Sequence, residues 1–335
     1  MKKNIIWVDY KISDHKDNNF VEVLDEFVGG DWILKEKITN NLHNSIFDNV
    51  LRILLYFLFP LTIVFKRYNY NRIIGWQQFY GLNFAFWCRI FHLKKVNDLT
   101  VMTFIYKRKR GFLGALYHKY IEYVVTSKYI DRFICFAKEE CKYYSDLFGV
   151  NKKKFMYIPL GINDIKANNE ISDEGFLFAT GRSNRNYNFI IDTLSNTRYK
   201  LIIASDIYKR THLPKNISIL QNCYGKDMLD LMSKCHCVLI PLKDLTMSSG
   251  QLVALQAMSL GKPVICTNSD GIKDYVINEV TGFLVDNLRE SWLEIINMLY
   301  SDTKLYVKMN KESLFIFNEK YTENAMFKRI ARCLS

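Results

Sequence analysis

Residues 246–286 read TMSSGQLVALQAMSLGKPVICTNSDGIKDYVINEVTGFLVD, and this stretch decides the fold of the chain. Just before it, the apolar residues Cys237–Ile240 end at Pro241, a pattern typical of a buried strand that stops at a sheet edge. A loop of small polar residues follows, and Leu252–Leu260 has the pattern of a helix that ends at Gly261. Strand, small-residue loop and helix in this order gather backbone N–H groups and a positive helix end at one point, where a phosphate can bind.

Working outward, strand-like and helix-like segments alternate along the chain. In the second half, the expected strands are Gly175–Thr180, Lys200–Ala204, Ile217–Leu220, His236–Ile240 and Pro263–Cys266. Such alternation predicts an α/β chain with parallel sheets and right-handed crossovers. In these sheets ligands bind beyond the carboxyl ends of the strands.

The length of 335 residues suits two domains better than one. An expected strand at Lys154–Ile158 runs into Pro159-Leu160-Gly161, which marks a boundary. We therefore predict an N-terminal domain over residues 1–160, a C-terminal domain over 161–318, and a terminal helix over 319–335 that packs back on the first domain.

The opening stretch resembles the donor-sugar half of the GT-B nucleotide-sugar glycosyltransferases, in the large retaining family that includes sucrose and mannosyl transferases. That family has Glu-Gly-Phe-Gly-Leu and then Glu-Ala-Met; this chain has Ser248-Ser249-Gly250-Gln251-Leu252 and then Gln256-Ala257-Met258. Ser248 and Gln256 thus stand where the family has glutamates. The resemblance is specific over residues 175–300 and weak before residue 125. It implies two Rossmann-like domains facing a central cleft.

Two arginines follow an expected strand end at Thr180-Gly181. Arg182 and Arg185 can both face one ligand, and guanidinium groups bind phosphate oxygens bidentately. In the resembling family a Gly-Arg at this place is followed by a Lys, and the pair holds the diphosphate. This chain has no such Lys, so we assign the second cation to Arg185. The alternative is that both arginines are surface residues of a loop.

The donor site implied by the resemblance has further members. Backbone amides of Ser249, Gly250 and Gln251 would bind phosphate beside Ser248, although a plain Ser cap on a buried helix gives the same pattern. Gln256 would bond the ribose through its amide, with an ordinary polar helix residue as the alternative. Tyr224 would stack on the base. No residue pattern distinguishes uracil from guanine as the base. We expect a UDP-sugar as the donor, although no residue of this chain selects it.

The acceptor side is less defined. The loop over residues 11–19 contains Asp14 and His15, which could serve as a general base or hold the acceptor; a surface turn is the preferred interpretation. The basic run Lys107–Gly111 is either a clamp for an acceptor phosphate or a solvated turn. No Asp-x-Asp pattern ends an expected strand, so we predict no metal and no cofactor.

The net charge of +12 is unevenly placed, because residues 51–160 contain 19 Lys and Arg against 6 Asp and Glu. Such a field favours an anionic membrane surface, a lipid phosphate or nucleic acid. No nucleic-acid-binding motif is present, so we expect no nucleic acid partner. A solvated face that promotes solubility is the alternative.

The longest apolar run, Ile53–Phe65, is short and includes Pro60, so no membrane-spanning segment is expected. A buried core helix is the preferred interpretation, and a segment that dips into a membrane interface is the other. Eight scattered cysteines suit a reducing cytosol, and the first residues do not resemble a signal peptide. We expect a cytoplasmic protein able to associate with the inner face of the plasma membrane.

These observations predict a metal-independent hexosyltransferase, retaining by resemblance. It would move a sugar from a nucleotide-sugar donor to a glycan or lipid-linked glycan acceptor in bacterial surface polysaccharide synthesis. Arg182 and Arg185 would stabilise the leaving diphosphate. A non-catalytic nucleotide-sugar or glycan-binding protein on the same fold is the alternative, and a nucleic-acid-binding protein is less favoured.

Overall fold

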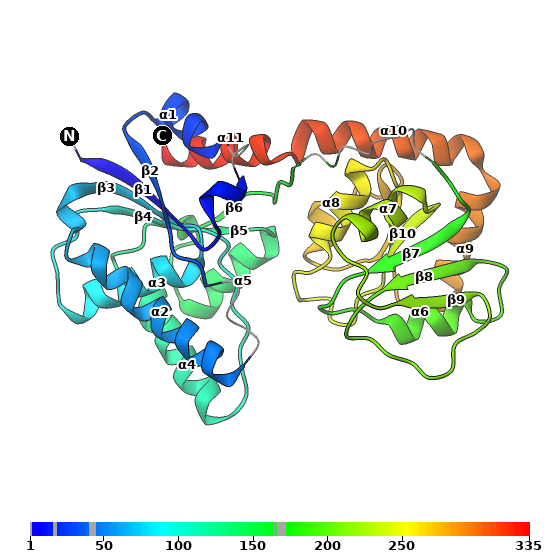
Figure 1. The fold of residues 1–335 in the computed structure, drawn as a ribbon, viewed down its shortest axis with the longest axis horizontal. Helices are drawn as coiled ribbons and strands as arrows, with labels where there is room; N and C mark the ends of the chain where they lie inside the picture. Colours follow the sequence, from blue (N-terminus) through cyan, green and yellow to red (C-terminus); the bar gives the residue numbers. More distant parts are fainter. Residues whose placement is uncertain (1, 16–18, 40–44, 164, 166–171) are drawn as a thin grey trace. The chain divides into compact units, whose positions relative to one another are not determined.

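A computed structural model describes residues 2–15, 19–39, 45–163, 165 and 172–335 (Figure 1). The chain forms two compact units: unit 1 comprises Met1–Ile158 and Phe327–Ser335, and unit 2 comprises Pro159–Met326. Each unit contains one six-stranded parallel sheet with interleaved helices, so the predicted pair of Rossmann-like α/β domains is confirmed. The chain rejoins unit 1 at Phe327, whereas the sequence boundary had been placed at residue 318.

The sheet of unit 1 has the strand order β2-β1-β3-β4-β5-β6, with all neighbours parallel. The strands are β1 (Lys3–Val8), β2 (Trp32–Glu36), β3 (Tyr70–Gly75), β4 (Asp98–Val101), β5 (Arg132–Cys135) and β6 (Phe155–Tyr157). The chain builds outward from β1 in one direction and from β3 in the other. The segments that follow β1 and β3 therefore flank the switch point of this sheet, where α/β sheets bind ligands.

In the described part of unit 1 there are five complete α-helices, and the end of a sixth, α11, joins them. They are α1 (Phe20–Val28), α2 (Ile46–Val64), α3 (Gln78–Ile90), α4 (Gly111–Val125), α5 (Lys138–Phe148) and α11 (Glu323–Leu334). Two short 3-10 segments beside strands are η2 (Arg67–Asn69) and η3 (Lys152–Lys154). On α11, Phe327 packs against the rings of Phe20 and Trp76, with centroids 4.6 and 6.2 Å away. These ring contacts attach the end of the chain to the first sheet.

Helix α2 runs through Pro60 without a break. A proline has no N–H, so it leaves the carbonyl four residues earlier, that of Tyr56, without its helical donor. Asn83 on α3 donates to this carbonyl at 2.9 Å, and Trp87 on the same helix donates to the carbonyl of Phe57 at 2.8 Å. Helix α3 thereby satisfies the carbonyl that the proline leaves without a donor, and its second bond ties α3 to the next residue of α2.

The preferred interpretation of Ile53–Phe65 as a buried core segment is wrong for most of its length. Only Pro60, Ile63 and Val64 of α2 are buried, while the first turns expose Ile46 and Phe47 by 85% and 74%. Among the described residues, α2 is a helix that is long and apolar enough to cross a membrane by length and composition, and 11% of its most apolar 18-residue window is buried. The apolar run had looked too short because the helix extends back across Asp48 and Arg52.

The sheet of unit 2 has the order β12-β11-β10-β7-β8-β9 and is also parallel throughout. Its strands are β7 (Phe176–Thr180), β8 (Lys200–Ala204), β9 (Ile217–Leu220), β10 (Cys237–Ile240), β11 (Val264–Thr267) and β12 (Gly282–Val285). Its helices are α6 (Tyr187–Leu194), α7 (Lys226–Lys234), α8 (Gln251–Ser259), α9 (Arg289–Ser301), α10 (Thr303–Lys320) and the short η4 (Ile272–Asp274). The order reverses between β7 and β10, which places the switch point at their carboxyl ends.

Candidate donor-binding site

The loops after β7 and β10 form one surface at the switch point of unit 2. The two strands pair with Ala179 opposite Leu239, so their carboxyl ends lie together. Beyond the strands, Asn186 N–H donates to Pro241 O at 2.8 Å, and Arg185 and Leu242 form an isolated bridge. The phosphate-binding stretches predicted from sequence, 181–185 and 248–251, are therefore brought to the same edge of the sheet.

Asn184 holds the two loops together. Its Nδ2 donates to Asp244 O at 2.8 Å and to Ser249 Oγ at 2.9 Å, and its Oδ1 accepts from Asp244 N at 2.8 Å. The backbone has a φ of 57°, a conformation that asparagine tolerates better than most residues. Sequence reasoning missed Asn184, although an asparagine in a turn after a Gly-Arg pair was an available signal.

The two arginines point into different surroundings. The Arg182 side chain is 69% exposed and pairs with Asp206, which follows β8. Arg185 is buried: its Nε donates to Thr180 O at 2.9 Å and its Nη1 to Ser183 O at 2.8 Å. Burial lowers the pKa of Arg185.

Gly181 explains how Arg185 fits. Its φ is 119°, and a Cβ at this position would lie 2.5 Å from Nη2 of Arg185. The Arg185 guanidinium thus fills the space under the turn and binds its carbonyl oxygens instead of facing solvent. Arg185 therefore positions the loop that carries Arg182, and its predicted contact with a phosphate stays a prediction.

Helix α8 begins within the small-residue loop. Gly250 is its N-cap with a φ of 92°, and a Cβ there would lie 2.8 Å from Ile272 Cδ1 and 3.0 Å from Ile240 Cγ2. Only glycine fits this backbone and this packing. Ser248 accepts a hydrogen bond from the Gln251 amide. The first-turn N–H groups of α8 have no partner within the helix, so they form the positive end that an anion would meet.

Lys243 is a second cation that the sequence analysis did not consider. It is exposed in the loop after β10, and its N–H donates to Asn184 O at 3.3 Å. A lysine only three residues beyond a buried strand was a usable signal. The hydrogen bond to Asn184 joins the Lys243 backbone to the loop that carries Arg182.

Two expected donor contacts lie elsewhere on unit 2. Gln256 is half-buried on α8, and Tyr224 is exposed in the loop between β9 and α7. Because β9 is the edge strand and β8 separates it from β7, Tyr224 follows a strand two positions from the switch point. Both roles remain predictions.

On unit 1, the side chains of Asp14 and His15 lie outside the described residues, although both belong to the 3-10 segment η1 (Ile12–His15). The described carboxylate at this switch point is Asp9, directly after β1. Its pKa is raised by burial, against a hydrogen bond from Gln77. Gln77 follows β3 and caps α3 by accepting from Phe79 N at 2.9 Å. Sequence reasoning missed Asp9, although an aspartate ending an apolar strand was visible.

Across the described ranges, no group of three or more His, Cys, Asp or Glu side chains is placed to hold a metal ion. The predicted independence from metal stays a prediction, because side chains are only one source of charge for a diphosphate.

Comparison with known proteins supports the same class. Residues 168–314 match the family described as Glycosyl transferases group 1. An uncharacterized glycosyltransferase of Methanocaldococcus jannaschii is 26% identical over 53% of this chain and 52% of its own length. The chain therefore spans about half the length of the curated relative it matches.

Solved structures match over nearly the whole chain. A glycosyltransferase from Rickettsia africae has a TM-score of 0.68 at 15% identity, covering 99% of this chain and 98% of its own. Anabaena HepE in complex with UDP has a TM-score of 0.69 at 15% identity, covering 100% and 99%; it has also been solved with UDP-glucose. The chain thus has the GT-B fold that the resemblance implies, and its second half is similar to the group 1 glycosyltransferase family.

Proposed function

We propose that this protein is a glycosyltransferase that moves a sugar from a nucleoside-diphosphate sugar to a hydroxyl of a glycan or lipid-linked glycan. The observation that carries the proposal is the joined pair of loops at the switch point of unit 2. There, exposed Arg182 and the first turn of α8 share one surface that Asn184 holds in place. The family match over residues 168–314 supports the same activity.

In the proposed reaction, an acceptor oxygen bonds to the anomeric carbon on the face from which the diphosphate oxygen departs, while the bond from that carbon to the diphosphate oxygen breaks. The configuration is therefore retained. The electron pair leaves with the nucleoside diphosphate, and the acceptor proton passes to a base. Arg182, Lys243 and the α8 amides would stabilise the leaving group, since fixed donors aimed at developing charge are a large catalytic term. Asp9, Asp14 and His15 are candidates for the base. Retention and independence from metal are part of the proposal.

We further propose UDP as the nucleotide, synthesis of a bacterial surface polysaccharide as the role, and the cytoplasmic face of the plasma membrane as the location. HepE, a protein of the same fold, was solved with UDP and UDP-glucose, which supports the nucleotide. The excess of basic residues over positions 51–160 supports a membrane-linked acceptor.

The proposal is tested first by binding. Unfolding temperature would be measured with UDP, GDP, ADP and their sugars, with and without EDTA. A ligand at a hundredfold excess over its Kd stabilises the folded state by about 2.7 kcal/mol. We expect one nucleotide to raise the unfolding temperature without added metal. If none did so, and none bound by calorimetry, the donor site would be refuted.

Turnover separates the enzyme from its main alternative, a non-catalytic sugar-nucleotide-binding protein. That alternative is favoured by Ser248, which occupies a family glutamate position and bonds within its own loop. The donor would be incubated with membrane lipid extracts and the released nucleoside diphosphate measured. Release above the protein-free rate is expected. Tight donor binding without release in any extract would favour the binding protein.

A further inference from the structure

The first turns of α2 and α4 expose large apolar side chains on unit 1. On α4, Phe112 and Leu113 are 77% and 78% exposed, matching Ile46 and Phe47 on α2. The exposed apolar set on these two helices is Ile46, Phe47, Val50, Ile53, Leu54, Leu58, Phe112, Leu113 and Leu116. So many exposed large apolar side chains at the ends of two helices are uncommon on a soluble domain unless something binds them.

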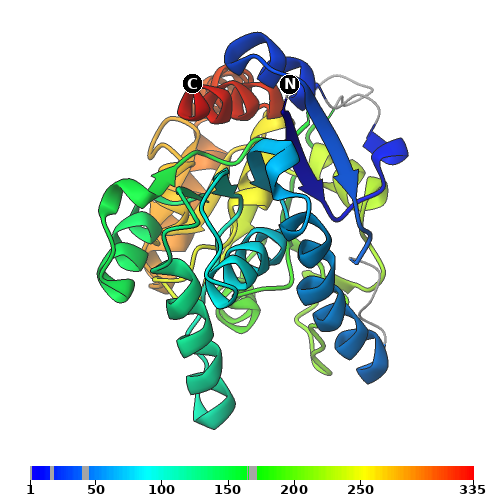
Figure 2. The ribbon, with the colours of Figure 1, turned by 90° about the vertical axis from the view of Figure 1, so that its left-hand side faces the viewer.

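The topology places both tips at one edge of the sheet. Helix α2 links β2 to β3 and α4 links β4 to β5, so both run from the carboxyl edge back to the amino edge. The two helices meet beside α3, where the rings of Phe57 and Tyr120 lie 5.7 Å apart. Figures 1 and 2 both show their ends projecting from the same side of unit 1. This edge also carries Asp9 and Gln77.

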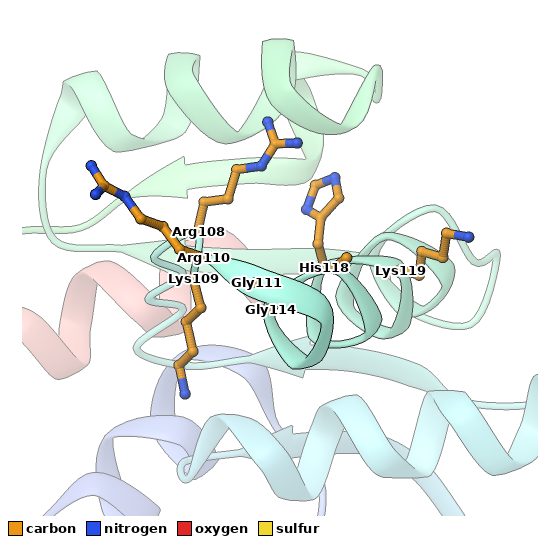
Figure 3. Close-up of a pocket in the computed structure, with 8 residues that line it drawn as sticks. Arg108, Lys109, Arg110, Gly111, Gly114, His118 and Lys119 are labelled. Carbon is orange, nitrogen blue, oxygen red and sulfur yellow. The ribbon is translucent and has the colours of Figure 1, made fainter.

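A basic turn lies directly beside the α4 tip. Arg108, Lys109 and Arg110 are exposed, and they line a hollow of about 610 Å³ with Gly114, His118 and Lys119 (Figure 3). The turn is held against the helix, because a Cβ on Gly114 would lie 2.3 Å from the Lys109 carbonyl. In Figure 3 the Arg108 and His118 side chains extend to the same side of α4, and Lys109 extends to the opposite side.

We propose that this surface, the α2–α4 face, docks unit 1 onto an anionic lipid bilayer. The apolar tips would enter the interface, and Arg108, Lys109 and Arg110 would bind lipid phosphates. Basic and apolar side chains combined on projecting helices are what an anionic interface selects, whereas a neutral protein partner would gain nothing from the arginines. The purpose of this docking rests on the proposed function. A lipid-linked acceptor in the bilayer would meet unit 1 at the carboxyl edge of its sheet.

The structure favours insertion of the first turns of α2 into one leaflet of the bilayer over a helix that spans it. The later turns of α2 are fixed in unit 1 by the bonds from Asn83 and Trp87 and by burial of Ile63 and Val64. The turns that precede these anchors, Ile46–Leu54, are about 14 Å long at 1.5 Å per residue. A hydrocarbon core is about 30 Å thick. The free turns therefore reach into one leaflet only.

Vesicle sedimentation tests the proposal without donor or acceptor, so its failure would leave the donor site untouched. The full chain would be mixed with phosphatidylcholine vesicles, either pure or containing about one third phosphatidylglycerol. We expect binding to the anionic vesicles only, weakened by salt. A chain that stayed in the supernatant with both would overturn the proposal.

Matched variants test whether the α2–α4 face is the part of the protein that binds the vesicles. We expect Phe112→Ser with Leu113→Ser to weaken partitioning at least tenfold, and Arg108→Glu with Arg110→Glu to abolish the preference for anionic lipid. The controls are Phe315→Ser, an exposed phenylalanine of unit 2, and Lys152→Glu with Lys153→Glu, exposed at the amino edge of unit 1. Both controls should bind as the parent does.

Three outcomes would overturn the assignment. The controls could lose binding equally. The Phe112 and Leu113 variant could instead convert a dimer into a monomer in sedimentation velocity, which would make the face a contact between two copies. Duplex DNA could bind as tightly as lipid with Arg108 and Arg110 required and Phe112 dispensable, which would make the partner nucleic acid.

Discussion

The two units share one sheet architecture but finish their strands differently. At the switch point of unit 2, Gly181, Asn184 and Gly250 make tight loops that are joined by hydrogen bonds. At the switch point of unit 1, the strands end in Asp9 and Gln77, beside helices whose first turns are apolar. The common scaffold fixes where a ligand can sit, and the residues that follow the strands decide which ligand it is.

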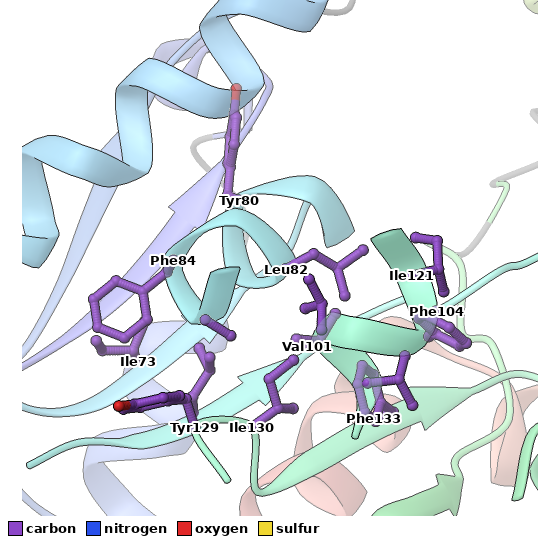
Figure 4. Packing of buried hydrophobic residues seen from close by; sticks show 14 of the residues in the cluster. Ile73, Tyr80, Leu82, Phe84, Val101, Phe104, Ile121, Tyr129, Ile130 and Phe133 are labelled. Atoms are coloured by element: carbon purple, nitrogen blue, oxygen red, sulfur yellow. The ribbon is translucent and has the colours of Figure 1, made fainter. Parts of the chain in front are cut away.

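The hydrophobic cores of the two units also differ in composition. Unit 1 packs aromatic rings on its sheet, such as Phe104 and Phe133 with centroids 4.7 Å apart (Figure 4). Beside the unit 2 switch point the core is mostly aliphatic, with Ile240, Val264 and Ile272 among its members. Small loops pack closely over aliphatic side chains, as Gly250 does on Ile240 and Ile272. The start of α8 is thereby packed against the core, with Ser249 and Gln251 buried on either side of Gly250.

The largest expected effect comes from removing the exposed guanidinium of unit 2. We expect Arg182→Ala to lower kcat/KM for the donor by about a hundredfold to a thousandfold, the usual loss for one stabilising donor. Stability should change little, because its ion pair with Asp206 is solvent-exposed on the arginine side. Steady-state kinetics and thermal unfolding would be measured on the same preparation.

Arg198→Ala is the matched control, since Arg198 is an exposed arginine of unit 2 that precedes β8 at the opposite edge of the sheet. It should leave kcat/KM unchanged. Equal losses in the two variants would contradict the placement of the diphosphate at the switch point.

A smaller effect is expected from Asn184→Ala, which removes the side chain between the two loops. The variant loses three hydrogen bonds in a conformation with positive φ. We expect about 1–3 kcal/mol less unfolding free energy. We also expect a rise of roughly tenfold in KM for the donor, which corresponds to about 1.4 kcal/mol of binding free energy. Denaturant unfolding and donor titration would test both parts.

Asn184→Asp serves as its partner variant, because a carboxylate keeps the acceptor for Asp244 N but cannot donate to Asp244 O or Ser249 Oγ. A stability loss with an unchanged donor KM in both variants would show that the joined loops are structural only.

The smallest effect on activity is expected at two lysines, the half-buried Lys154 and the buried Lys262, one at the amino edge of each sheet. Lys154 donates to Val125 O and Ser127 O at 2.6 and 2.7 Å, and Lys262 donates to Cys235 O at 2.8 Å. Burial lowers the pKa of Lys154 to about 8, and burial also lowers that of Lys262. An unfolded lysine titrates near 10.4.

Between pH 8 and about 10.4 the unfolded chain therefore holds more protons at Lys154 than the folded chain does, so stability rises with pH. Below pH 8 both forms are protonated and the contribution is constant. We expect the difference in unfolding free energy between the parent and Lys154→Met to grow in favour of the parent over this window. Donor KM should be unaffected. A flat or falling difference would contradict the lowered pKa.

Regular local patterns were predicted well. The expected strands Lys200–Ala204 and Ile217–Leu220 have these bounds in the structure. Helices α1 and α3 were not predicted. Helix α3 is apolar around much of its circumference and is buried from Tyr80 to Ala85, so it lacks the one-sided periodicity that marks a surface helix.

Sequence alone determined the alternation of strands and helices, the small-residue loops and the presence of two cations after β7, because these depend on steric preferences and periodicity over a few residues. The tertiary structure decided the strand order, and with it that residues 181–185 and 248–251 meet. It also decided that Arg185 turns inward while Arg182 faces solvent, and that the first turns of α2 stay uncovered. These outcomes depend on which distant segments pack together, and no local pattern encodes the space that remains around a side chain.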